Sequence, residues 1–184
     1  MQAQDKIIIA EIGSVHDGSF GNAKKLIEAA SDCGADCVKF QTHIADAESL
    51  PKAPNPGYFK DEPRLDYFNR TSFSIDQWVA LKKKADEKES LFLSSPFSIE
   101  AIKILEKINI YAYKIPSGEV TNLPLLEEIS KIGKPVFLSS GMSNWNELDE
   151  AVNVLSKKCN LTVMQCSSAY PCPVEKVGLN IISE

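Results

Sequence analysis

CVKFQT at residues 37–42 is a strand-like run that follows a helical segment after one short turn, the basic unit of an α/β fold. In that segment, NAKKLIEAASDC at residues 22–33, apolar side chains recur from Ala23 to Ala30 at the spacing of one helix face. Gly34 ends the helix and the strand begins at once. Such pairs repeat along the chain at about 20–30 residues per unit, the spacing of βα repeats.

The repetition predicts six strands and five helices in an α/β fold with a parallel sheet. The strands are residues 7–12, 37–42, 91–95, 111–116, 135–140 and 161–167, and the helices are residues 22–33, 74–88, 98–108, 123–133 and 144–158. A closed (β/α)₈ barrel needs eight strands and usually about 250 residues, whereas this chain has 184. Periodicity alone leaves two architectures open, an open doubly wound sheet and a barrel without its last quarter.

The composition is that of one globular domain over residues 1–184, with 43% hydrophobic and 24% charged residues. The net charge of −5 argues against a nucleic-acid-binding surface. No apolar run has the length of a signal sequence or a membrane span. The five cysteines include no C-x-x-C pair, which favours reduced thiols over disulfides or a zinc site. We therefore expect a cytoplasmic protein that binds neither nucleic acid nor membranes.

Every strand-like run ends on hydroxyl, amide or charged residues, for which core packing gives no reason. These residues are Glu11, Lys39, Gln41, Ser94, Ser95, Lys114, Ser117, Glu119, Ser139, Ser140, Ser167, Ser168 and Tyr170. Parallel strands deliver their carboxyl ends to one edge of a sheet, where α/β enzymes carry their active sites. The pattern predicts a site for an anionic, oxygen-rich substrate.

Two lysines are central to this prediction. Alternate side chains of CVKFQT share a face, so Lys39 and Gln41 point away from the apolar face. A buried lysine is costly unless an anion pairs with it; the alternative is a surface lysine that snorkels from an edge strand. Lys114 lies late in its own strand, and Ser117 follows with a hydroxyl. Together they suit a phosphate and carboxylate cradle, and the absence of a Walker A or G-x-G-x-x-G run disfavours nucleotides.

The run EIGSVHDGS places Glu11, the only acid of the first strand, just before a loop that contains His16. His16 suits a proton carrier, an anion donor or a metal ligand, and equally a structural hydrogen-bonding residue. The only other histidine, His43, opens the next loop, so the chain has no self-sufficient histidine-rich metal site.

Residues 43–73 have no clean period and are rich in proline and aromatic residues, including Tyr58, Phe59, Tyr67 and Phe68. Loops of this length are uncommon in compact domains and are usually functional. The segment is therefore either an Ω-loop pinned by its aromatic side chains, or a lid or subunit contact.

Six runs together closely resemble the N-acetylneuraminate (sialic acid) synthase family. They are IAEIGSVHDGS, GADCVKFQT, FLSSPFS, YKIPSGEVTNLPLLEEI, GKPVFLSSGMS and QCSSAYPCP, and they span the chain in the family's order. The resemblance implies a (β/α)₈ TIM barrel, of which this chain holds about six β/α units. The SVHDG loop departs from the commoner NHNG form and resembles a subgroup linked to bacterial surface polysaccharides.

The resemblance implies a role for each matching residue. Positions that hold phosphoenolpyruvate match Lys39, Ser95, Lys114, Ser117 and Ser139, and Ser168 stands where many members have asparagine. Sugar-contacting positions match Gln41, Glu119 and Tyr170, and an acid near the reacting centre matches Glu11. Glu11, Lys39 and Lys114 are therefore the expected catalytic residues, and the others are expected to bind substrate.

The implied reaction condenses phosphoenolpyruvate with an N-acetylated hexose such as N-acetylmannosamine, giving a nonulosonic acid and phosphate. The enol C3 attacks the open-chain aldehyde, whose oxygen is polarised by a divalent metal, Mn²⁺ or Mg²⁺. Water adds at C2, and the tetrahedral intermediate expels phosphate. The lysines offset negative charge throughout, and Glu11 handles a proton at the aldehyde or the water.

The resemblance also implies parts that this chain does not contain. The family's metal-binding histidines and its C-terminal antifreeze-like domain, which closes the partner's site in a homodimer, would follow Glu184. Residues 1–184 are then a single, incomplete barrel domain without a metal site, and we expect this chain alone to be inactive.

Two other hypotheses stay open. One is a Schiff-base aldolase on the same barrel, with Lys39 or Lys114 as the nucleophile. The other is a non-catalytic fragment that binds an anion or assembles with a second polypeptide through its exposed strand edges.

Overall fold

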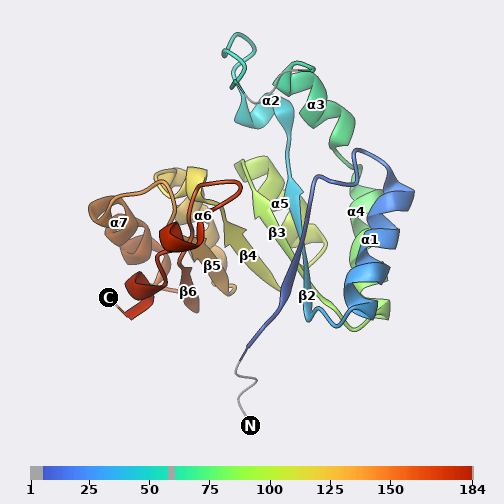
Figure 1. Cartoon of the computed structure of the whole chain (residues 1–184). Helices are drawn as coiled ribbons and strands as arrows, with labels where there is room; N and C mark the ends of the chain where they lie inside the picture. Colours follow the sequence, from blue (N-terminus) through green and yellow to red (C-terminus); the bar gives the residue numbers. More distant parts are fainter. Residues whose placement is uncertain (1–5, 58–60, 184) are drawn as a thin grey trace. The chain divides into compact units, whose positions relative to one another are not determined.

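The computed structural model describes residues 6–57 and 61–183, and the chain divides into two compact units. Unit 1 comprises residues 1–111 and unit 2 comprises residues 112–184. Parallel strands alternate with helices in each unit (Figure 1).

Unit 1 contains three parallel strands in the order β1, β2, β3. Its elements are β1 (Ile9–Gly13), α1 (Phe20–Asp32), β2 (Cys37–Thr42), α2 (Ala45–Glu48), α3 (Arg64–Thr71), α4 (Ile75–Glu87), β3 (Leu91–Pro96) and α5 (Ile99–Lys107). In the register of β1 and β2, Glu11 lies opposite Lys39, and an irregularity follows before Gly13. In the register of β2 and β3, Gln41 lies opposite Ser95. The pairing therefore brings polar residues of all three strands to their carboxyl ends.

The core of unit 1 lies between these strands and the helices α1 and α4, which run side by side in Figure 1. Phe40 of β2 stacks on Phe92 of β3, with ring centroids 5.2 Å apart, and Trp78 of α4 meets Phe40 edge-on at 5.8 Å. Burial of each such side chain contributes about 1.5–3 kcal/mol. Lys84 and Glu28 join the two helices at 2.8 Å, but this partly exposed ion pair contributes little beside the apolar layer.

Serine side chains cap the starts of two helices in unit 1. Ser74 and Gln77 form a complete capping box at the start of α4. Ser98 accepts a hydrogen bond from the backbone N–H of Ala101 at the start of α5, without a reciprocal partner. These caps satisfy backbone donors that would otherwise be orphaned at the helix ends.

Unit 2 repeats the plan with three parallel strands in the order β4, β5, β6. Its elements are β4 (Ala112–Ile115), η1 (Ser117–Glu119), α6 (Leu123–Ile132), β5 (Val136–Ser139), α7 (Trp145–Leu155), β6 (Leu161–Met164), η2 (Val174–Lys176) and η3 (Leu179–Ser183). The hydroxyl of Ser130 on α6 donates to the carbonyl of Val154 on α7 at 2.8 Å, which ties the two helices together. Gly133 ends α6 with a φ of 79°, a conformation that glycine adopts without strain.

The segment 43–73 contains two short helices, α2 and α3, where the sequence shows no period. Helices of four and eight residues are too short for an apolar repeat to be recognisable. Aromatic contacts hold the segment, since Phe68 of α3 stacks on His43 with centroids 4.0 Å apart. Tyr58 and Phe59, part of the same aromatic prediction, lie outside the described residues.

The six predicted parallel strands and five predicted helices are all present, and α2 and α3 are additional helices that the sequence did not predict. Closure into a TIM barrel and the single-domain organisation stay predictions. Within residues 6–57 and 61–183, every helix is too short or too polar to cross a bilayer.

Candidate functional site

The carboxyl ends of β1, β2 and β3 gather four of the predicted site residues of unit 1. Glu11 Oε2 lies 2.6 Å from Lys39 Nζ, as expected from their register on β1 and β2. Lys39 Nζ also donates to the hydroxyl of Ser95 on β3 at 3.3 Å. Gln41 follows on the same face of β2.

Lys39 is only 7% exposed, whereas the side chain of Glu11 is 53% exposed. The edge-strand alternative for Lys39 is wrong, because β2 pairs with β1 on one side and with β3 on the other. A buried ammonium needs a compensating partner, and Glu11 provides it. The cation is therefore held inside the unit while its carboxylate partner faces solvent.

The amide of Gln41 is held from two sides. Its Oε1 accepts from the Ser14 hydroxyl at 3.4 Å and lies 3.3 Å from His43 Nε2. Gly13 allows the loop after β1 to approach closely, with a φ of 52°; a Cβ there would lie 3.0 Å from Glu11 Oε1.

His43 is a site residue to which the sequence prediction gives no role. Its ring lies between the rings of Phe68 and Phe97, each 4.0 Å away and nearly parallel. Its Nδ1 lies 2.8 Å from Glu48 Oε1. The signal was its position two residues after Gln41, since residues i and i+2 of an extended strand share a face.

Of the roles considered for His16, the structure supports that of a structural hydrogen-bonding residue. It is 1% exposed, its ring packs tilted against Phe73 with centroids 4.5 Å apart, and its Nδ1 accepts the backbone N–H of Gly18 at 3.1 Å. Burial lowers the pKa of His16, and Asp17 raises it in part. A buried imidazole that is already used as a local acceptor fixes the loop after β1.

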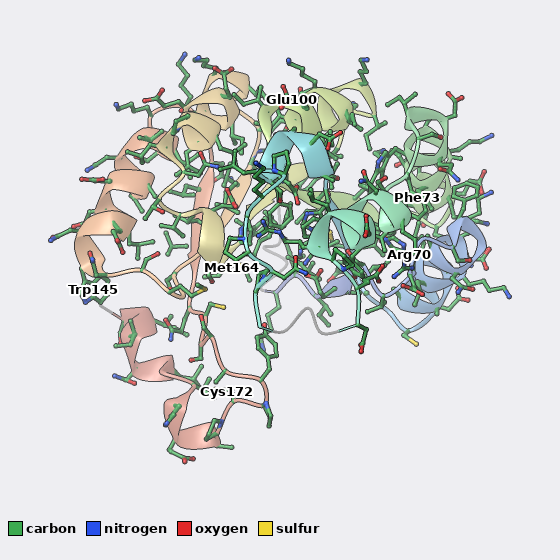
Figure 2. All side chains as sticks on the ribbon, turned by 90° about the horizontal axis from the view of Figure 1, so that it is seen from above. Arg70, Phe73, Glu100, Trp145, Met164 and Cys172 are labelled. Atoms are coloured by element: carbon green, nitrogen blue, oxygen red, sulfur yellow. The ribbon has the colours of Figure 1, made fainter. Side chains whose placement is uncertain are left out.

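The same loop is clamped to α3 by Arg70. Its guanidinium donates to Asp17 Oδ1 at 2.7 Å and to Glu62 Oε1 at 2.5 Å. Figure 2 shows Arg70 and Phe73 together where α3 leads into α4. The loop after β1 and the segment 43–73 are therefore anchored to each other.

A second cluster of predicted site residues forms within unit 2. Lys114 of β4 donates to the hydroxyl of Ser139 on β5 and to the carbonyl of Ile115 at 2.9 Å. The hydroxyl of Ser117 lies 3.8 Å from Cys166 Sγ, within hydrogen-bond range of sulfur. Strand ends again bring an ammonium and hydroxyl groups together.

Gly141 lies against the hydroxyl groups of Ser117 and Ser168. A Cβ at this position would lie 2.7 Å from Ser117 Oγ, 2.9 Å from Ser168 Oγ and 3.2 Å from the carbonyl oxygen of Cys166. Only glycine lets these oxygens approach so closely. The sequence prediction does not single out Gly141, because nothing local distinguishes it from a turn glycine.

The turn after β5 borders a cavity of about 400 Å³ that lies wholly within unit 2. Ser140, Gly141 and Cys166 are among its lining residues. The Ser140 hydroxyl donates to Gln165 Oε1 at 3.2 Å and accepts from the backbone N–H of Cys166 at 3.3 Å. These bonds fix the turn against the segment after β6.

Two predicted sugar-contacting residues, Glu119 and Tyr170, also belong to unit 2. Glu119 Oε2 accepts from the side-chain amide of Asn122, the N-cap of α6, at 2.7 Å. Tyr170 is 94% exposed. Their assignment to the sugar stays a prediction from the resemblance.

The described residues do not fit a metal centre. Within residues 6–57 and 61–183, no three histidine, cysteine, aspartate or glutamate side chains gather as a metal site would require.

A family model for the NeuB family matches residues 26–184, most of the chain. The chain belongs to the NeuB family. This NeuB-family chain is 40% identical over 182 residues to N,N'-diacetyllegionaminic acid synthase of Campylobacter jejuni, covering 94% of the chain and 54% of that protein. It is 34% identical to human N-acetylneuraminate-9-phosphate synthase, covering 96% and 51%.

A third relative is the spore coat polysaccharide biosynthesis protein SpsE of Bacillus subtilis, which is 32% identical to this NeuB-family chain. The match covers 95% of this chain and 48% of SpsE. The chain thus spans about half the length of the curated relatives it matches.

Solved structures support the same assignment. The sialic acid synthetase of Leptospira borgpetersenii, crystallised with citrate, superposes with a TM-score of 0.84 at 27% identity, covering 96% of this chain and 59% of that one. A truncated 3-deoxy-D-arabino-heptulosonate 7-phosphate synthase of Thermotoga maritima gives 0.61 at 11% identity, covering 89% and 54%, which shows similarity of fold alone.

Proposed function

We propose that this NeuB-family chain is part of an enzyme that condenses phosphoenolpyruvate with an N-acetylated hexose, such as N-acetylmannosamine, to a nonulosonic acid with release of phosphate. Its relatives include proteins named as synthases of legionaminic and sialic-type acids and a protein of spore coat polysaccharide biosynthesis. The product would accordingly serve surface polysaccharide synthesis in the cytoplasm.

The observation that carries the proposal is the cluster in unit 2. Lys114 meets the Ser139 hydroxyl, while Ser117 and Ser168 converge on Gly141. A phosphate or carboxylate needs an ammonium together with several short donors, and rotatable hydroxyl groups supply them. We assign this cluster to the anionic groups of phosphoenolpyruvate.

The cluster in unit 1 suits the charge and proton changes of the reaction. Lys39 and Ser95 offer N–H and O–H donors to an anionic oxygen, the role that the resemblance implies. Glu11 keeps its carboxylate in solvent while it contacts Lys39, so it can take or give a proton beside a fixed positive charge. Gln41 presents its amide to the sugar.

We assign Glu119 and Tyr170 to the sugar as well, on the resemblance alone. A divalent metal, Mn²⁺ or Mg²⁺, would polarise the aldehyde when bound, and we expect its ligands among residues after Glu184. A homodimer of the whole protein is part of the same proposal.

The test is calorimetric titration of this chain with phosphoenolpyruvate. Lys114→Gln removes the ammonium from the cluster, and its affinity should fall by roughly 10- to 100-fold, because hydrogen bonds to charged groups are worth about 1.5–3 kcal/mol. Lys131→Gln is the matched control: Lys131 is an exposed lysine of α6 in the same unit, paired with Glu128. It should bind within about twofold of the wild type.

Equal affinity of the two variants would contradict the assignment. With N-acetylmannosamine and Mn²⁺ added, we expect no phosphate release by this chain. Borohydride should trap no adduct of a carbonyl substrate; a trapped lysine adduct would support the aldolase alternative instead.

A further inference from the structure

We propose that His43, held by Glu48, is the positioning residue that fixes the amide of Gln41 for the sugar substrate. The proposal rests on the proposed function for the identity of the ligand. It extends that function to two residues that lie outside the clusters described for phosphoenolpyruvate.

Glu48 fixes the orientation of the His43 ring through the proton on Nδ1. The Nδ1 of its ring lies 2.8 Å from Glu48 Oε1. A carboxylate oxygen only accepts hydrogen bonds, so Nδ1 carries a proton. The other oxygen of Glu48 accepts the backbone N–H of Ile44 at 3.3 Å, which holds the carboxylate at the start of α2. The orientation of the imidazole is thus set by a backbone-anchored acid.

Two phenylalanine rings fix the plane of the His43 ring. Phe68 and Phe97 cover both faces of His43, with interplanar angles of 9° and 17°. The side chains of His43 and Glu48 are 9% and 7% exposed. A ring confined between two aromatic faces and hydrogen-bonded at one nitrogen has no freedom to turn. Its Nε2 is therefore directed at one place.

That place is the Gln41 amide. Nε2 of His43 lies 3.3 Å from Gln41 Oε1, which only accepts, so Nε2 donates to it and both ring nitrogens carry protons. The hydroxyl of Ser14 donates to the same oxygen at 3.4 Å. Two contacts at one end fix the rotation of the amide about its last bond, a torsion that is otherwise broad. In the described part of the chain, no protein acceptor contacts Gln41 Nε2. The free end of the amide is available to an oxygen of the ligand, such as a sugar hydroxyl or an acetamido carbonyl.

Both short helices of segment 43–73 contribute to this arrangement. In Figure 1, α2 follows directly from the carboxyl end of β2, and α3 lies beside it. Glu48 belongs to α2 and Phe68 to α3, so both helices act on one ring. A glutamine placed by two helices loses less rotational freedom on binding than a mobile one, which favours affinity for its ligand.

The test uses His43→Phe, which keeps an aromatic ring between Phe68 and Phe97 but removes both nitrogens. In the first arm, the side-chain amide signals of the ¹⁵N-labelled chain are recorded without ligand, with Gln41 assigned by its loss in Gln41→Ala. We expect the Gln41 pair to move toward the position of a free amide. The Gln77 pair, whose amide caps α4 far along the chain, serves as the internal control and should not move. An unchanged Gln41 pair would overturn the proposal.

In the second arm, the same variant is titrated with N-acetylmannosamine and with phosphoenolpyruvate. We expect about tenfold weaker binding of the sugar, the value of one hydrogen bond whose geometry is lost, and phosphoenolpyruvate affinity within about twofold. Equal losses for both ligands would indicate a structural role and contradict positioning.

Glu48→Gln keeps the size of the side chain and repeats both arms if His43→Phe does not fold. It should move the Gln41 signals in the same direction, with about a threefold loss of sugar affinity. If the wild-type chain binds neither ligand, the proposed function fails, while the amide signals still decide whether His43 positions Gln41.

Discussion

The two units each place a lysine at the polar ends of parallel strands, and the two lysines donate hydrogen bonds to different groups. In unit 1, Lys39 is buried against the carboxylate of Glu11 and donates to Ser95. In unit 2, the hydrogen bonds of Lys114 to Ser139 and Ile115 go to neutral oxygens.

The different contacts suit the two lysines to different tasks. A buried ammonium beside a carboxylate is a compensated pair, suited to moving charge or a proton at a fixed place. An ammonium that donates to a rotatable hydroxyl group is suited to an incoming anion, because the hydroxyl can turn to donate to the anion's oxygens. Substitutions in both units test this contrast.

Gly141→Ala should have the largest effect. The added methyl would lie 2.7 Å from Ser117 Oγ and 2.9 Å from Ser168 Oγ, so both hydroxyl groups must move away. Loss of two such donors, at about 0.5–1.5 kcal/mol each, should weaken phosphoenolpyruvate binding by roughly 10- to 100-fold. Calorimetric titration measures this loss. Gly118→Ala is the control, since nothing lies within 4 Å of its added carbon; similar losses in both variants would show that the hydroxyl cluster does not hold the anion.

Glu11→Gln should destabilise the chain more than Lys39→Met does. The first leaves a buried ammonium without its counter-charge, which we expect to cost about 1–2 kcal/mol after allowance for the exposure of Glu11. The second leaves only a solvent-facing carboxylate, and an apolar side chain fits the buried site. Urea unfolding at pH 7 compares them. Glu128→Gln, which removes an exposed pair with Lys131 in unit 2, should stay within about 0.5 kcal/mol of wild type.

The smallest expected effect is the pH dependence that His16 gives to unit 1. Burial lowers the pKa of His16 in the folded chain, whereas in the unfolded chain it titrates near about 6.5. As the pH falls below that value, the unfolded state takes up a proton that the folded state resists, so the free energy of unfolding falls.

His16→Asn keeps an acceptor for Gly18 without a titrating ring. Urea unfolding at pH 7.5 and 5.5 should show a smaller loss of stability on acidification for the variant than for wild type. An equal loss in both would mean that His16 does not contribute to this pH dependence.

The features that could be predicted from the sequence are those that depend on the local pattern of residues. The spacing of CVKFQT and its preceding helix fixed the strand, its apolar face and the side of Lys39. The capping box of Ser74 and Gln77 could be read in the same way. These features are decided by residues a few positions apart, and the periods of helix and strand report them directly.

The remaining features depend on residues that are distant along the chain. The ion pair of Glu11 with Lys39 follows from strand register, and Gly141 matters because Ser117 and Ser168 approach it. His43 lies between a phenylalanine of α3 and one that follows β3. The periods of helices and strands carry no information about contacts between distant residues, so the sequence alone did not reveal these contacts.

The clamp that Arg70 makes with Asp17 and Glu62 has a consequence for how this chain accommodates change in length. Arg70 anchors the chain on the α3 side of this segment and His43 anchors it on the α2 side, so the residues between α2 and α3 join two fixed points. Doubling the length of such a loop costs only about 0.6 kcal/mol in closure entropy. Nothing lies within 4 Å of a side-chain carbon built at Gly57. Insertions at this point should leave both anchors intact, which makes it the natural place to attach a reporter or tag.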